Sequence, residues 1–74
     1  MRDMNIIRPG RVVAQEFGGV RRAARALGCD SAQVSRWATG ARLIPSWWLE
    51  RIMRVAAAHG ITLTAQDLVV GRPE

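Results

Sequence analysis

The sequence predicts an all-α fold of five short helices, organised around a helical pair within residues 20–39. Ala24 lies in the middle of one short apolar pattern there, and Gly28 follows it four residues later. Val34 and Trp37, three residues apart, then place two apolar side chains on one face of a second helix. This spacing is typical of a helix-turn-helix, in which two short helices cross at a tight turn.

The turn between these two helices, predicted over residues 19–27 and 31–39, carries residues suited to a sharp change of direction. Gly28 follows the first of them, where glycine adopts a positive φ at little cost. Asp30 is predicted to cap the second, because its carboxylate can accept from the free N–H groups of the first turn. Gly40 ends that second helix. The opposing face of the first helix is expected to consist of Val20, Ala24 and Leu27.

Three further helices are predicted on either side of this pair. One covers residues 9–17 and begins at Pro9, whose missing N–H costs nothing at the first helical position. A longer helix begins at Pro45 or Ser46 and continues to His59. Thr64 and Asp67 form an approximate capping box that starts a short final helix. The inward positions of the longer helix are expected to be Trp48, Ile52 and Val55, joined by Leu49 and Ala56.

The motif resembles the helix-turn-helix of the Cro/CI-type phage repressors, the XRE family, whose spacing Ala24, Gly28, Val34 and Trp37 match. The wider sequence, EFGGVRRAARALG followed by IPSWWLERIMRVAAAHGITLTAQDL, is similar to a small phage and bacterial subfamily with an "IP" dipeptide before a long fourth helix. The resemblance implies a compact five-helix, lambda-repressor-like DNA-binding domain over residues 9–70. Residues 1–8 are expected to form an N-terminal arm, and residues 71–74 a frayed C-terminal tail.

The net charge of +5 is concentrated in the predicted DNA-binding segment. All eleven basic residues are arginines, which suits phosphate and guanine contacts, although a GC-rich genome would also replace lysine by arginine. Residues 20–42 contain five arginines against the single carboxylate of Asp30, which leaves a local charge of +4. A compact basic patch of this kind is typical of nucleic-acid-binding proteins. Arg25 is the exception, because it is also a candidate to pair with Glu16.

The outward face of the predicted second motif helix supplies the candidate DNA contacts. By resemblance to the family, base contacts are expected from Ser31, Ala32, Ser35 and Arg36. Arg36 is suited to a bidentate pair with guanine O6 and N7; the alternative for it is a phosphate contact or simple solvation, and for Ser35 a phosphate contact. Contacts to the DNA backbone are expected from Arg21, Arg22, Gln33, Thr39 and Arg42. The alternative for these arginines is ordinary surface charge.

A homodimer is expected, because one helix with so few long polar side chains cannot specify a genomic site alone. The apolar candidates for the dimer surface are Trp47, Leu63, Val69 and Val70. Trp47 lies about 100° around the helix from Trp48 and is expected near Arg51 and Arg54. Trp47 marks either an interface or the edge of the small core. The family resemblance places the dimer contact late in the chain, at Val69 or Val70.

These features predict a sequence-specific double-stranded DNA-binding transcriptional regulator, foremost a repressor that acts as a homodimer on an inverted-repeat operator. Two alternatives remain at this stage. One is a DNA-binding antitoxin or a phage excision or packaging factor, and the other is a protein-interaction module that uses the Trp47 face. A salt-titrated DNA-binding assay separates these classes, because only DNA binding depends steeply on salt.

Enzymatic, metal-binding and membrane functions are not expected. The carboxylates are scattered without a pair suited to acid–base work, and Cys29 has neither a second cysteine nor a nearby histidine with which to bind zinc. No cofactor site is expected. No apolar run approaches the roughly 20 residues of a membrane span, and the first ten residues lack the apolar core of a signal peptide. A cytoplasmic, nucleoid-associated location is therefore expected.

Overall fold

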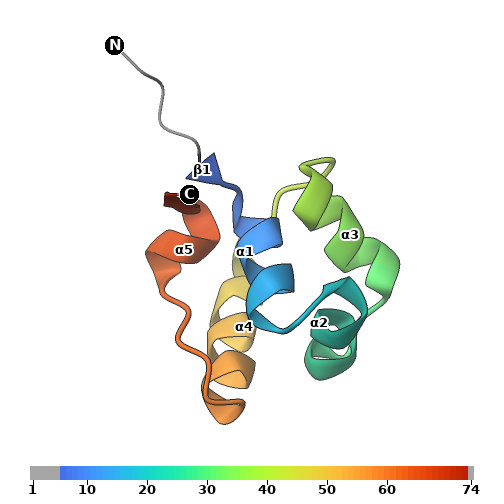
Figure 1. Cartoon of the computed structure of the whole chain (residues 1–74), viewed down its shortest axis with the longest axis vertical. Helices are drawn as coiled ribbons and strands as arrows, with labels where there is room; N and C mark the ends of the chain where they lie inside the picture. Colours follow the sequence, from blue (N-terminus) through green and yellow to red (C-terminus); the bar gives the residue numbers. More distant parts are fainter. Residues whose placement is uncertain (1–5, 74) are drawn as a thin grey trace.

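Five helices make up most of the chain. The computed structural model describes residues 6–73, with helices α1 (Pro9–Glu16), α2 (Val20–Leu27), α3 (Ser31–Thr39), α4 (Ser46–Ala58) and α5 (Ala65–Val69) (Figure 1). Two very short strands, β1 (Ile6–Ile7) and β2 (Arg72–Pro73), flank them. The prediction of a compact, mostly helical domain with five helices is confirmed, and each predicted helix lies within two residues of its expected bounds.

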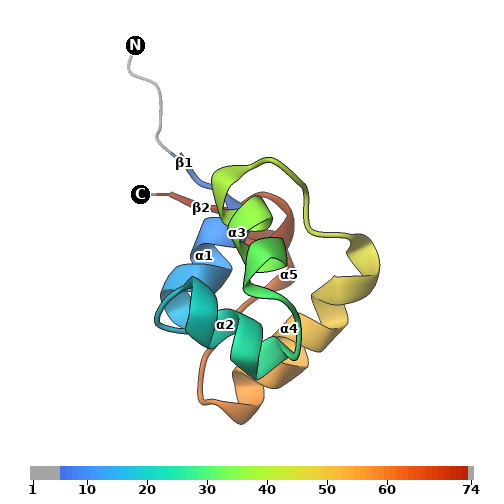
Figure 2. The ribbon, with the colours of Figure 1, turned by 90° about the vertical axis from the view of Figure 1, so that its right-hand side faces the viewer.

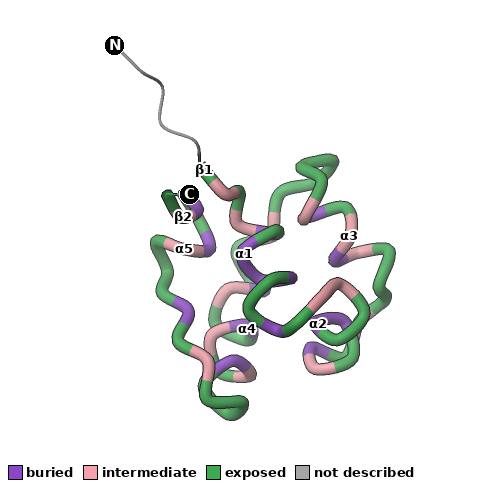
Figure 3. Tube along the Cα trace, viewed as in Figure 1, coloured by how far each residue is buried: buried purple, intermediate pink, exposed green. Residues whose placement is uncertain are grey.

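The helices enclose one apolar core, with α1 near its centre. α1 packs against α2 and α3 on one side and against α5 on the other, while α4 contacts both α2 and α5 (Figures 1 and 2). Buried and exposed positions alternate around the helices (Figure 3). The core consists of Val12, Val13, Ala14, Phe17, Ala23, Ala24, Leu27, Val34, Trp37, Trp48, Ile52, Ala56, Leu63 and Leu68.

Two of the five expected inward residues of α4 are less buried than predicted. Trp48, Ile52 and Ala56 are buried, at a spacing of four residues, whereas Leu49 and Val55 are only half-buried. The buried residues of α4 therefore recur every four residues and form a narrow apolar stripe. Val55 lies at the edge of this stripe.

α1 and α3 cross so closely at Gly10 that no side chain fits between them. A Cβ atom at Gly10 would overlap the backbone carbonyl group of Trp37, and Gly10 itself is buried. Gly10→Ala is therefore expected to lower the free energy of unfolding by about 1–3 kcal/mol through overpacking. This loss is expected even though alanine has a higher helix propensity than glycine.

Chemical denaturation measures this effect. Gln15→Ala, on the exposed side of the same helix, is the matched control and should change the free energy of unfolding by no more than about 0.5 kcal/mol. If Gly10→Ala matched Gln15→Ala, the close α1–α3 crossing would be disproved.

The two ends of the described chain pair with each other. β1 and β2 are antiparallel, with Ile6 opposite Pro73 and Ile7 opposite Arg72. The expectation of a frayed tail over residues 71–74 is wrong for Arg72 and Pro73, and Ile6–Ile7 is not part of a free arm. Two-residue strands carry no periodic signal, and their partners lie at opposite ends of the sequence. Residues 1–5 of the expected arm and Glu74 of the tail lie outside the described residues.

Arg72 holds this end of the molecule with two ion pairs. Its Nη1 lies 2.9 Å from Glu16 Oε2, and its Nη2 lies 3.0 Å from Asp67 Oδ2. Arg25, a candidate partner for Glu16, does not form that pair. Asp67 also completes the predicted capping box with Thr64, whose hydroxyl accepts from the Asp67 N–H at 3.1 Å. Hydrogen bonds from the Arg72 guanidinium and from the Thr64 N–H lower the pKa of Asp67 to about 2.

Candidate nucleic-acid interface

A three-residue turn sets the angle between α2 and α3. α2 ends at Gly28, whose φ of 74° confirms the predicted left-handed position, and the Cys29 N–H donates to the Ala24 carbonyl at 3.0 Å. Asp30 occupies the N-cap position of α3 in an extended conformation, but its side chain makes no capping hydrogen bond. The expectation of a side-chain cap is therefore wrong. α3 ends at Gly40, whose φ is 86°.

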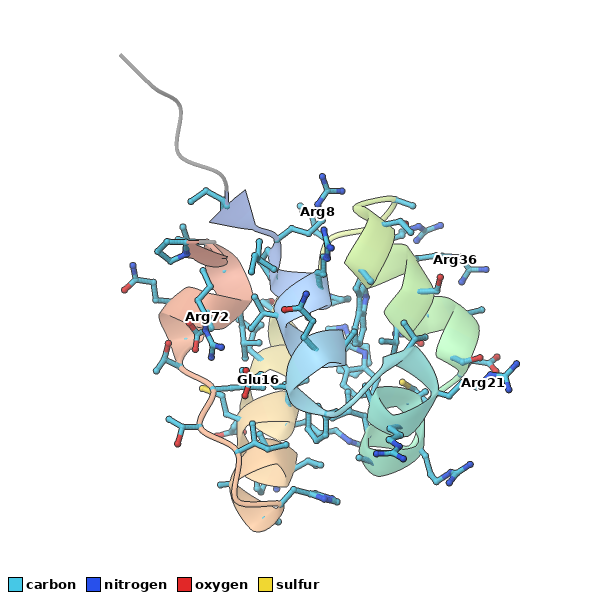
Figure 4. The ribbon with its side chains drawn as sticks, viewed as in Figure 1. Arg8, Glu16, Arg21, Arg36 and Arg72 are labelled. Carbon is cyan, nitrogen blue, oxygen red and sulfur yellow. The ribbon has the colours of Figure 1, made fainter. Side chains whose placement is uncertain are left out.

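The two faces of α3 differ sharply. Val34 and Trp37 are buried against α1 and α2. Ser31, Ala32 and Arg36 are exposed, as expected of candidate base contacts, and Figures 3 and 4 show this outer edge of the helix free of other elements. The half-buried positions on the flanks of α3 are Gln33, Ser35 and Ala38. Ser35 therefore lies at the margin of the exposed face, because α2 packs beside it.

Two hydrogen-bonding groups, the Thr39 hydroxyl and the Arg8 guanidinium, contact the C-terminal end of α3. The Thr39 hydroxyl donates to the Arg36 carbonyl at 3.3 Å and accepts from the Ala41 N–H at 3.4 Å, so it helps to terminate the helix. Arg8 donates from Nη1 to the Thr39 carbonyl. This places a cation at the negative end of the α3 dipole. Sequence analysis missed Arg8, because the contact joins residues far apart in the chain.

The arginines divide into a paired and an unpaired group. Of the ten arginines among residues 6–73, only Arg72 lies within 4.0 Å of a carboxylate oxygen of a described residue. Arg72 and Glu16 meet beside α1 and α5, whereas Arg8, Arg21 and Arg36 lie on the side of α2 and α3 (Figure 4). Two of the few carboxylates are thus neutralised away from α3.

The expected backbone contacts surround the exposed side of α3. Arg21 and Arg22 are exposed on α2, and the Arg22 side chain lies over the turn at Gly18. Arg42 follows α3 and borders a hollow together with Gln33 and Arg36. We call Arg8, Arg21, Arg36 and Arg42 the basic face. It presents four guanidinium groups, and none of them has a carboxylate of residues 6–73 in ion-pair range.

Three of the four residues of the predicted dimer surface are exposed, and one is not. Leu63, in the segment between α4 and α5, is buried in the core. Trp47, Val69 and Val70 remain exposed, as expected. The Trp47 ring packs against that of Trp48 at 5.1 Å. Arg51 lies over the Trp48 ring, at 5.2 Å from its centroid.

Cys29 and His59 both pack against residues of the core. Cys29 is half-buried in the turn after α2, and burial raises the pKa of its thiol. The His59 ring packs edge-on against Phe17 at 5.9 Å, at the end of α4. Within residues 6–73, no three His, Cys, Asp or Glu side chains gather closely enough to hold a metal ion. No helix in that range has the length and hydropathy required to cross a membrane.

Comparison with protein-family models, with curated proteins and with solved structures finds no match to this chain.

Proposed function

We propose that this chain binds double-stranded DNA in a sequence-specific manner as a lambda-repressor-like helix-turn-helix protein, and represses transcription by occupying a promoter. One observation carries the proposal: α3 buries Val34 and Trp37 and presents Ser31, Ala32 and Arg36 beside arginines that pair with no carboxylate of residues 6–73. A short helix with a polar outer face fits the major groove. The surrounding arginines suit the phosphates on either side of that groove.

Each residue then has a distinct role on the DNA. Arg36 donates to guanine O6 and N7, Ser31 bonds a base or a phosphate, and Ala32 is restricted to apolar contact with a thymine methyl group. Arg21 and Arg22 hold α2 against the sugar–phosphate backbone. Gln33 and Ser35, on the half-buried flanks, and Thr39 and Arg42, at the end of α3, contact phosphates.

The phosphate contacts predict a definite salt dependence. The slope of log K against log salt concentration is negative, and removing one arginine that neutralises a phosphate reduces its magnitude by about 0.9. Arg21→Ala, Arg22→Ala and Arg42→Ala are each expected to show this decrease on duplexes of any sequence. Arg54→Ala, which removes an exposed arginine of α4, is the control and should keep the slope. If none of the three variants changed the slope, the surface formed by Arg22 and the basic face would not be the DNA surface.

A homodimer on an inverted repeat completes the proposal. One copy of α3 offers few long polar side chains, and each base pair contributes only about 1–3 kcal/mol of discrimination. Two copies related by a two-fold axis double the contacts, on half-sites about one helical turn apart. Val69 and Val70, which are 64% and 57% exposed, are the proposed dimer contact.

Light scattering of charged variants tests the dimer surface. Val69→Glu and Val70→Glu are expected to give monomers, because an apolar contact cannot bury an unpaired carboxylate. Trp47→Glu, on the 69% exposed side chain of α4, is expected to leave the dimer intact. Dissociation by Trp47→Glu alone would move the interface to α4, and a wild-type monomer that protects one half-site would disprove the dimer.

The second candidate is a protein-interaction module. It is favoured by the exposed ring of Trp47, since exposed tryptophans are enriched at protein interfaces. Selection from a pool of random duplexes separates the candidates: recovery of a common sequence supports DNA recognition, and failure to bind any duplex at low salt contradicts it.

A further inference from the structure

Leu43 is the most exposed of the large apolar side chains of residues 6–73, at 87% of its maximum. It lies in the loop after α3, next to Arg42 of the basic face. Leu43 borders a hollow whose other sides are formed by Gln33, Arg36, Trp37, Arg42 and Pro45. The aliphatic side chain of Leu43 is therefore exposed to solvent at the same hollow as Arg36, which is proposed to contact guanine.

The loop folds back along α3, because Leu43 and Pro45 share this hollow with Gln33 and Arg36 of the helix. A ligand that reaches Arg36 from the solvent also meets Leu43. The hollow measures about 310 Å³, roughly ten times the share of volume of one water molecule. It has room for the edge of a base.

Major-groove chemistry offers one apolar group to such a side chain. Guanine, cytosine and adenine present hydrogen-bonding atoms at this edge, and thymine alone adds a methyl group, at C5. An aliphatic side chain beside Arg36 cannot bond the polar atoms, but it can shield the methyl group from water.

We propose that Leu43 is a specificity-determining residue that contacts the C5 methyl group of a thymine close to the guanine bound by Arg36. The inference rests on the proposed function and adds one further base contact, beyond those of α3, to each half-site. The recognised half-site then contains a guanine and a thymine within reach of one another, and Leu43 contributes preference without a hydrogen bond.

Replacement of thymine by uracil tests this contact directly, because uracil lacks only the methyl group. A duplex selected by the wild-type chain is prepared with each dT exchanged in turn for dU. Affinities are measured for the wild-type chain, for Leu43→Ala and for Leu43→Met, which keeps an apolar side chain. At one position of each half-site, dU is expected to weaken wild-type binding about fourfold, the equivalent of about 0.8 kcal/mol for one buried methyl group. Leu43→Ala should bind dT and dU equally there, and Leu43→Met should retain the preference.

Several outcomes would overturn the inference, and they are distinguishable from failure of the proposed function. If the selected duplex binds but no position responds to dU, or if Leu43→Ala keeps the response, Leu43 does not contact a thymine methyl group. Leu43 also borders an apolar groove that includes Leu68 and Val69. A Leu43→Ala variant that becomes monomeric and keeps the dU response would assign Leu43 to an interface between copies instead. Recovery of no duplex at all would remove the proposed function, and this inference with it.

Discussion

Arg36→Ala is expected to abolish sequence-specific DNA binding while the domain stays folded. Arg36 is exposed on α3 and pairs with no carboxylate of residues 6–73, so its removal leaves no unpaired charge in the core. A bidentate arginine–guanine pair contributes about 1–3 kcal/mol of discrimination, and a dimer loses that contribution in both half-sites. The combined loss of affinity for the selected duplex is therefore expected to be on the order of 30-fold to 10⁴-fold.

The comparison that checks this prediction uses selected and scrambled duplexes. Arg36→Ala should lose most of its affinity for the selected duplex and little for the scrambled one. Arg54→Ala carries the same change of charge on α4 and should preserve the ratio of the two affinities. An equal loss of affinity on both duplexes would show that Arg36 contacts the DNA backbone and does not discriminate between bases.

Trp37→Ala is expected to destabilise the whole domain. The Trp37 side chain is 3% exposed, and its ring packs edge-to-face on that of Trp48 with centroids 5.4 Å apart. Its backbone lies under Gly10, where α1 crosses α3. Truncation of a buried tryptophan typically costs about 3–5 kcal/mol, which is a large part of the 5–15 kcal/mol that a small domain has in total.

Thermal and chemical denaturation measure this loss. Trp47→Ala is the matched control, because it removes the same side chain from a site that is 69% exposed. It should cost much less than Trp37→Ala at the same protein concentration. A Trp37→Ala variant with the melting temperature of the wild type would contradict the burial of Trp37. It would also contradict the orientation of α3, in which the Trp37 side faces the core.

Most features that rest on local sequence could be predicted from it; the side-chain cap expected of Asp30 is an exception. Gly28 and Gly40 mark the ends of α2 and α3, because few other residues adopt a positive φ there. Thr64 and Asp67 are three residues apart, and a capping box requires that spacing. The inward facing of Val34 and Trp37 followed from helical periodicity, and it fixes which residues of α3 remain exposed.

Features that join distant segments were the ones that could not be predicted. The pairing of Ile6–Ile7 with Arg72–Pro73 brings two dipeptides together, and neither carries a pattern of its own. The same holds for the contact of Arg8 with Thr39 and for the ion pair of Arg72 with Glu16.

The candidate site shows the same division. Helical periodicity predicted which residues of α3 are exposed, the family resemblance implied their base contacts, and local composition indicated the basic patch. The position of Leu43 beside Arg36 had no sequence signal, because it depends on the path of the loop after α3. The burial of Leu63 was missed for a similar reason: a residue outside a helix carries no periodic pattern to indicate which way it faces.

Protection of DNA from methylation by dimethyl sulfate tests most directly whether α3 lies in the major groove. The reagent methylates guanine N7 in the major groove and adenine N3 in the minor groove, so one experiment reports on both. We expect the wild-type chain to protect guanine N7 in both halves of an inverted repeat, with half-site centres about one helical turn apart, and Arg36→Ala to lose that protection. Protection confined to adenine N3, or unaltered protection of guanine N7 by Arg36→Ala, would contradict the proposed docking of α3.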